Sequence, residues 1–130
     1  MWKEELPMNC PPESAKEMET SAYRILKEEV PQESDFLPYV HLYPDNSRYK
    51  TLCEAFALSS FDSIQNAKAA WKRAFKKGKV IGGYICEIQI KPSDGKNNLN
   101  QKTGHISTWL YDTRANNLFE CTDINPINEN

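Results

Sequence analysis

The segment of residues 55–79, AFALSSFDSIQNAKAAWKRAFKKGK, constrains the fold more than any other part of the chain. Its first residues alternate loosely between apolar and polar side chains, which predicts a short, partly buried strand. Asp62 or Ser63 can cap a following helix, because a short side-chain oxygen accepts from the free N–H groups of the first turn. Gly78 is well placed to end that helix. The segment therefore predicts a strand, a polar turn and a helix over residues 63–77.

The predicted helix is amphipathic, with basic side chains over most of its polar surface. No acidic residue lies between Lys68 and Lys79. A basic face of this kind is most often solvated and complements the negative end of the helix, but it can also attract an anionic partner. The apolar side chains fall on one side of a helical wheel: Ile64, Ala67, Ala70, Trp71, Ala74 and Phe75.

Further strands are predicted on both sides of this helix. Alternation of apolar and polar residues indicates strands at residues 20–27, 80–91, 105–112 and 118–122. The last two are expected to form a hairpin, and the polar stretch of residues 92–104 is expected to be a long loop. The pattern predicts an α+β fold: a single compact domain, a mostly antiparallel sheet and one main amphipathic helix.

The length of 130 residues favours one domain around one core. Residues 1–19 contain three prolines and are expected to form an irregular arm. The domain itself is expected over residues 20–124, and residues 125–130 are expected to be a frayed tail.

Charge and hydropathy limit the partners. A formal net charge of −2 gives no overall attraction to nucleic acid, which is therefore disfavoured as a partner. No apolar run approaches the roughly 20 residues that span a bilayer, and the first residues lack the apolar centre of a signal peptide. A cytoplasmic location without a membrane partner is expected.

Four cysteines are widely separated: Cys10, Cys53, Cys86 and Cys121. They form no C-x-x-C pair, and the chain has only two histidines, so no metal site is expected. Buried structural thiols are favoured over disulfides.

Five candidate binding or catalytic side chains lie at or near predicted strands. Two interpretations of Arg24 are open. Its guanidinium group either reaches water from the strand or binds a phosphate or carboxylate through two parallel hydrogen bonds. Ser59 and Ser60 can bind a ribose or satisfy the turn that follows them. Glu87 and Glu120 are the carboxylates that could serve an enzyme, although strand carboxylates usually face solvent.

A stripe of polar and aromatic side chains follows one face of the strand at residues 105–112. His105, Ser107, Trp109 and Tyr111 alternate along it. Aromatic rings of this kind can stack on a base or a nicotinamide ring. Alternatively, Trp109 and Tyr111 belong to the core and His105 caps the strand.

The order of these elements over residues 20–122 resembles the ADP-ribosyltransferase-like fold of many small bacterial toxin and defence proteins. Residues 22–24, Ala-Tyr-Arg, resemble the motif of the first strand, and residues 59–61, Ser-Ser-Phe, resemble the motif that precedes a helix. The third motif is often Glu or Gln, any residue, then Glu. This chain has Glu-Ile-Gln at residues 87–89, in the reverse order, and a separate Glu120.

The resemblance implies NAD as the cofactor and a protein or nucleic acid as the acceptor. Arg24 would hold the pyrophosphate or a ribose, and Ser59, with Ser60 and His105 nearby, would support the nicotinamide ribose. Phe61 or Trp109 would stack near the nicotinamide. The catalytic residue would be Glu120 or Glu87, which would stabilise the positive charge that develops as nicotinamide leaves.

A non-catalytic interaction module is the alternative, as a subunit, an inhibitor or an immunity-type partner. The irregular arm, which carries Trp2 and Met8, could dock onto another chain. The polar loop at residues 92–104 also suits partner binding, and fold alone does not decide between the two functions.

Overall fold

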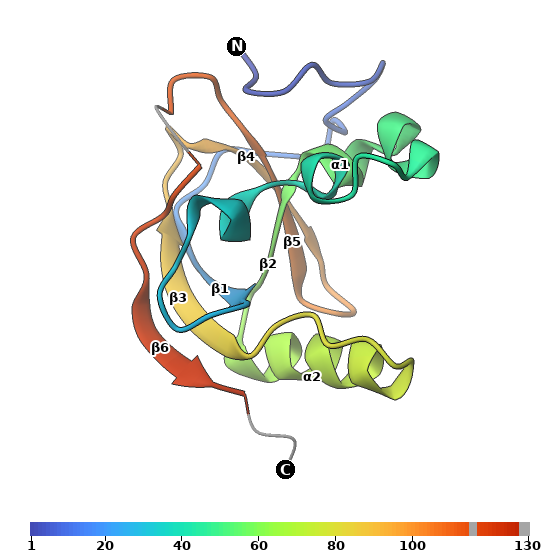
Figure 1. Ribbon diagram of the computed structural model, residues 1–130. Coiled ribbons are helices and arrows are strands. Elements are labelled where there is room, and N and C mark those ends of the chain that lie inside the picture. Colours follow the sequence, from blue (N-terminus) through green and yellow to red (C-terminus); the bar gives the residue numbers. More distant parts are fainter. Residues whose placement is uncertain (115–116, 128–130) are drawn as a thin grey trace.

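The fold is built around one β-sheet. The computed structural model describes residues 1–114 and 117–127. Within these residues, six antiparallel strands form one sheet in the spatial order β4-β5-β2-β1-β3-β6 (Figure 1). One main helix lies beside the sheet, so the predicted α+β fold class is confirmed. The sheet and the helix form a single domain. The strands are β1 (Thr20–Leu26), β2 (Leu58–Phe61), β3 (Tyr84–Ile90), β4 (Gly95–Asn100), β5 (His105–Leu110) and β6 (Thr122–Pro126).

Helix α2 spans Ile64–Lys76, almost as predicted. The hydroxyl of Ser63 accepts a backbone N–H of the first turn at 3.1 Å, so Ser63 rather than Asp62 is the N-cap. Gly78 ends the helix with φ of +81°. A residue with a side chain would lose about 1–2 kcal/mol in that conformation, which explains why glycine stands there.

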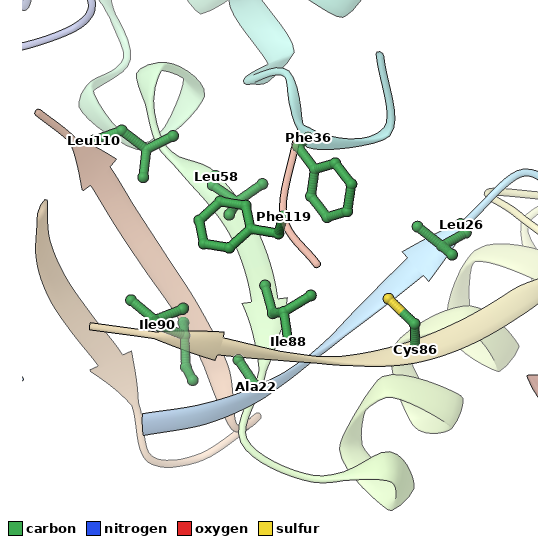
Figure 2. Packing of buried hydrophobic residues seen from close by; sticks show 10 residues of the cluster. Ala22, Leu26, Phe36, Leu58, Cys86, Ile88, Ile90, Leu110 and Phe119 are labelled. Atoms are coloured by element: carbon green, nitrogen blue, oxygen red, sulfur yellow. The ribbon is translucent and has the colours of Figure 1, made fainter. Parts of the chain in front are cut away.

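Alternate residues of the strands belong to two hydrophobic clusters, because successive side chains of a strand point to opposite faces. On β1, Ala22 and Leu26 belong to the first cluster, whereas Ile25 belongs to the second. Figure 2 shows the first cluster, in which Phe36 and Phe119 pack over the strands with ring centroids 5.5 Å apart. Both phenylalanines come from segments outside the sheet.

Helix α2 contributes to the second cluster through Ala67 and Trp71. The indole Nε1 of Trp71 donates to the backbone oxygen of Gly82 at 2.8 Å, which ties the helix to the segment before β3. Ile64 and Phe75 are 37% and 42% exposed. The buried stripe of the helix is therefore narrower than the predicted apolar face.

The connection between β1 and β2 consists of short helical turns. Helix α1 lies near the start of β2, whereas α2 follows the end of β2 (Figure 1). No helix in the described part of the chain is long and apolar enough to cross a membrane. The turns are η1 (Glu33–Phe36), α1 (Tyr39–Leu42), η2 (Ser47–Thr51) and η3 (Cys53–Phe56).

The N-terminal arm, residues 1–19, is irregular as expected, but it is not loose. Trp2 pairs with Tyr111 through a β-bridge, and their ring centroids are 5.0 Å apart. Lys16 forms a second bridge with Asn97 of β4, in which each backbone N–H donates to the other residue's oxygen. The arm therefore packs on the β4–β5 end of its own sheet.

The predicted hairpin between residues 105–112 and 118–122 is wrong. Strand β5 instead pairs with β4, which lies inside the expected loop of residues 92–104, and β6 pairs with β3. The strand β4 was missed because its sequence, GKNNLN, has little apolar alternation. Its buried Asn97 accepts the Thr108 hydroxyl across the β4–β5 pair at 2.6 Å, so a polar contact replaces the usual apolar one.

The expectation of a frayed tail from Asn125 onward is wrong for the first two residues. Asn125 and Pro126 belong to β6 and face β3. Residues 128–130 lie outside the described residues.

The cysteine prediction fails for one pair. Cys10 and Cys53 form a disulfide that joins the N-terminal arm to η3, with Cα atoms 5.6 Å apart. Cys86 and Cys121 are free thiols. The two bonded cysteines are 43 positions apart, and nothing in the local sequence brings them together.

Gly95 tests how tightly β4 is held against β5. A Cβ atom at this position would lie 2.1 Å from the backbone oxygen of Trp109, which is rigid sheet backbone. We expect Gly95→Ala to lower the free energy of unfolding by about 2 kcal/mol, because overpacking forces the strands apart. Urea denaturation followed by circular dichroism measures the change.

The matched control is Gly83→Ala. A Cβ atom there would meet a backbone oxygen at 3.6 Å, an ordinary contact, so the stability should change little. Equal effects of the two substitutions would contradict the close approach of β4 and β5.

Candidate functional site

A cleft opens where β1 and β2 separate. Among the described residues, these strands share the single registered pair Tyr23–Phe61, whereas β1 pairs with β3 along its whole length. The diverging parts of β1 and β2 line a cavity of about 290 Å³, which is closed on its other sides by η1, α1, α2 and the start of β5. We call this cavity the split-sheet cleft.

Arg24 bridges the gap between the separated strands. Its Nε donates to the backbone oxygen of Asp35 in η1 at 2.7 Å, and its Nη1 donates to the backbone oxygen of Ser59 in β2 at 2.8 Å. Burial lowers the pKa of Arg24, yet arginine remains charged in proteins. Both acceptors are neutral carbonyl groups, so these bonds fix the guanidinium without cancelling its charge.

The Asp35 carboxylate also lines the cleft, but backbone groups use both of its oxygens. It accepts from the N–H groups of Lys27 at 3.3 Å and Gln32 at 2.8 Å. These bonds hold η1 against the end of β1, and they leave the carboxylate in a structural role.

Ser59 and His105 meet across β2 and β5. The distance from Ser59 Oγ to His105 Nε2 is 2.6 Å. Burial, and next the charge of Arg24, lower the pKa of His105, so the imidazole is neutral near pH 7. A neutral imidazole can accept a hydrogen bond from the Ser59 hydroxyl at Nε2. Phe61 packs edge-on against the same imidazole, with ring centroids 5.4 Å apart.

Two tyrosines of the α1 region form the aromatic side of the cleft. Tyr39 and Tyr43 line the cavity and are 41% and 52% exposed. Their rings lie 5.8 Å apart, and Tyr49 contacts both, at 5.6 Å and 6.0 Å. These residues were not predicted from the sequence, although the spacing of four between Tyr39 and Tyr43 is a helical spacing that could have signalled them.

The structure brings four of the predicted cofactor-binding residues together. Arg24, Ser59, Phe61 and His105 all line the split-sheet cleft. The other two lie outside it. The fully buried Ser60 sits on β2 between Ser59 and Phe61, and its side chain points to the opposite face of the strand.

Trp109 is part of the packing of the N-terminal arm. It is 1% exposed and belongs to a cluster with Ala15 and Ala57. Its Nε1 donates to the backbone oxygen of Cys53 at 3.0 Å. The ring therefore fixes η3 and the arm, and it offers no face to the cleft.

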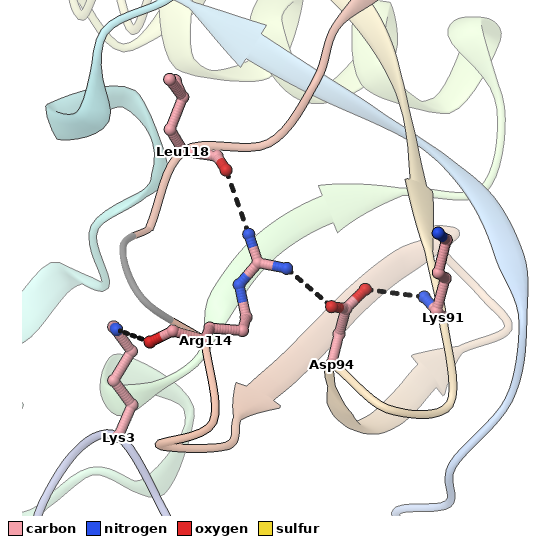
Figure 3. Close-up of polar contacts among 5 residues, drawn as sticks. All are labelled: Lys3, Lys91, Asp94, Arg114 and Leu118. Carbon is pink, nitrogen blue, oxygen red and sulfur yellow. Dashed lines mark hydrogen bonds and ion pairs between the residues drawn. The ribbon is translucent and has the colours of Figure 1, made fainter.

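The predicted catalytic carboxylates, Glu87 and Glu120, line a different cavity. This cavity of about 580 Å³ lies between β3 and the segment that leads to β6, and we call it the β3-edge pocket. Arg114 lines it too and is fixed by the Asp94 carboxylate at 2.6 Å and by the Leu118 oxygen at 3.1 Å (Figure 3). Neither glutamate lines the split-sheet cleft.

Comparisons with protein-family models, with curated proteins and with solved structures gave no match. The resemblance to ADP-ribosyltransferase-like domains therefore stays a prediction. Among the described residues, no group of three or more histidine, cysteine, aspartate or glutamate side chains could hold a metal ion.

The environment of His105 predicts a pH dependence. Its pKa should lie below the ordinary value of 6.5, and removing the nearby charge in Arg24→Gln should move it back upward. NMR titration of the imidazole carbons measures both. Since the folded pKa is the lower one, the stability that neutral His105 contributes is complete above pH 6.5 and is lost as the pH falls toward the folded pKa.

Arg48→Gln is the control, because Arg48 is an exposed arginine that does not line the cleft. It should leave the titration of His105 unchanged. A pKa of His105 at or above its ordinary value would contradict the buried position beside Arg24.

Proposed function

We propose that the split-sheet cleft binds NAD, in the manner that the resemblance to ADP-ribosyltransferase-like domains implies. The observation that carries the proposal is the convergence of Arg24, Ser59 and His105 in one cavity. These residues come from three strands, and the resemblance implies a role in cofactor binding for each of them.

Arg24 suits the pyrophosphate. A guanidinium has five N–H donors, and within the described residues its bonds use Nε and Nη1. The remaining donors and the positive charge are available to a phosphate oxygen, and the Asp35 carboxylate offsets part of that charge. Lys27 also lines the cleft and supplies a second positive charge. The cleft thus combines a guanidinium group held by two hydrogen bonds with the ammonium group of an exposed lysine.

Other residues of the cleft suit the ribose, adenine and nicotinamide groups of NAD. Ser59 and His105 offer a hydroxyl and a ring nitrogen to ribose hydroxyls. Tyr39 and Tyr43 are exposed aromatic rings against which adenine or nicotinamide can stack. A cavity of about 290 Å³ is smaller than a whole dinucleotide needs, so part of the ligand lies over the open rim.

The proposal extends to ADP-ribosyl transfer to a macromolecular acceptor, in a toxin or defence setting, with one change in roles. Glu87 and Glu120 line the β3-edge pocket, so neither is assigned to the reaction. His105 takes the catalytic position instead. Its neutral imidazole can remove the proton of an acceptor hydroxyl or amine beside the nicotinamide ribose.

The N-terminal arm no longer supports the alternative of a non-catalytic interaction module. That alternative relied on a loose N-terminal arm, and that arm is joined to the domain by the disulfide and by two β-bridges. No contact in the described residues favours this alternative specifically, so we keep NAD binding as the proposal.

A cytoplasmic location stays a prediction, and the disulfide argues against it. Disulfides are rare in the reducing cytosol and common in oxidising compartments. Cys10–Cys53 joins the N-terminal arm to η3. Alkylation of thiols in intact cells before lysis decides between the two locations, since a cytosolic pool would be labelled at both cysteines.

Isothermal titration calorimetry with NAD tests the proposal. We expect binding heat at millimolar NAD and a rise in Tm. Arg24→Lys keeps the charge but loses the fork geometry, and should weaken binding about tenfold. ADP-ribose should bind nearly as well as NAD, because it retains the pyrophosphate that Arg24 contacts, whereas nicotinamide alone should not bind.

Two controls make the result specific. Glu120→Gln and Glu87→Gln should leave NAD affinity unchanged, because both residues line the other pocket. Arg24→Lys must keep a cooperative thermal transition to count as a folded variant. Absence of both heat and a Tm shift with wild-type protein would remove the proposal, and equal losses from all three variants would remove the assigned site.

A further inference from the structure

Cys86 and Cys121 face each other at the edge of β3. Their sulfur atoms are 2.9 Å apart, with the Cys86 thiol donating to Cys121. Cys86 lies on β3 within the first hydrophobic cluster (Figure 2). It is fully buried, whereas Cys121 immediately precedes β6 and is half-buried. A register shift between Ile85 and Glu87 of β3 interrupts the β3–β6 pairing at this point. The two thiols therefore meet where the backbone ladder does not hold the strands.

The two thiols differ in solvent access and in acidity. The hydrogen bond from Cys86 lowers the pKa of Cys121, while the same bond and then burial raise the pKa of Cys86. The thiolate thus forms on Cys121, the one that solvent can reach. Arg24, which is paired with Cys86 in the β1–β3 register, opposes part of the rise in the pKa of Cys86.

We propose that Cys86 and Cys121 are a reactive dithiol that a low-molecular-weight disulfide oxidises to a second disulfide, with Cys121 as the attacking sulfur. The proposal is independent of NAD binding. Its basis is the contact between the sulfur atoms and the difference in their exposure.

The oxidation takes place in two displacements. The Cys121 thiolate attacks one sulfur of oxidised glutathione, which forms a mixed disulfide and releases one glutathione thiolate. Cys86 then gives up its proton to solvent and attacks the Cys121 sulfur, which releases the second glutathione thiolate and closes the Cys86–Cys121 bond. The two protein thiols lose two electrons, and one molecule of oxidised glutathione gains them.

Closure would change the stability of the sheet. The bond would join β3 to the segment before β6 across a sequence separation of 35 residues, and would tie down the segment that borders the β3-edge pocket. Loops of this length, when closed by a disulfide, raise Tm on the order of 10 °C. All four cysteines of the chain would then be paired, as expected for a small domain in an oxidising compartment.

Oxidised glutathione and peptide mapping test the proposal. Each cysteine lies on its own tryptic peptide, so mapping separates this pair from Cys10–Cys53. The starting material is protein treated with mild reductant, in which alkylation confirms that Cys86 and Cys121 are free thiols. We expect wild-type protein to yield the cross-linked Cys86 and Cys121 peptides, to lose two hydrogen atoms in mass and to gain thermal stability.

Single variants identify the attacking sulfur. Cys86→Ala keeps an apolar side chain in the core and should trap one glutathione on Cys121, since no second thiol can release it. Cys121→Ser should leave Cys86 unmodified over the same time, because that thiol is buried. Thermal melts show whether each variant is folded, and if Cys86→Ala is not, an early mixed disulfide at Cys121 in wild-type protein serves instead.

Three results would overturn the proposal. Wild-type protein could keep both thiols open to alkylation after the treatment, or it could hold a lasting glutathione adduct without the cross-link. In the third, Cys121→Ser would take up glutathione as fast as Cys86→Ala does. Each result would show that the sulfur contact does not produce the assigned chemistry.

Discussion

The hydrogen bonds of Arg24 are the interaction on which the rest of the structure depends. A sheet that opens between two central strands leaves backbone carbonyl groups without their ladder partners, and buried carbonyls without partners are costly. Arg24 supplies donors to Ser59 in β2 and to Asp35 in η1 from a single rigid plane. Bonds from a charged donor contribute about 1.5–3 kcal/mol each. The residue that keeps the cleft open is therefore also the residue that brings positive charge into it.

Strand order decides which side chains can take part in the cleft. Strand β5 is the neighbour of β2, so His105 reaches Ser59 directly. Strand β3 is separated from β2 by β1, so Glu87 lies on the far side of Arg24. The polar groups of the molecule are divided between two cavities, a basic one with hydroxyl and imidazole groups and another that contains both glutamates.

The features that could be predicted from the sequence are those set by local chemistry. The Ser63 cap, the Gly78 end and the apolar stripe of α2 act within a few residues, so their pattern is readable. The strand β4 escaped prediction because Asn97 is held by a cross-strand contact that leaves no apolar signature. The hairpin partner of β5 was misplaced because Phe119 alternates like a strand residue but packs on Phe36 instead.

Among the candidate site residues, too, those marked by local motifs could be predicted and those that depend on long-range contacts could not. Arg24 and Ser59 were identified from short motifs of predicted strands, whereas the roles of the two glutamates depended on strand order, which no local pattern contains. The tyrosines of α1 and the Cys10–Cys53 bond arise from segments that meet only after the chain has folded.

The backbone pairing of Lys16 with Asn97 also protects the sheet against growth. An outer strand with free N–H and C=O groups is a template on which another chain can add a strand. Lys16 occupies those groups at Asn97 on the β4 side. On the β6 side, Pro126 has no N–H to offer, and Asp123, with φ of +49°, bends the backbone away from extended geometry. Both outer strands are thus poor templates for the addition of a strand from another chain.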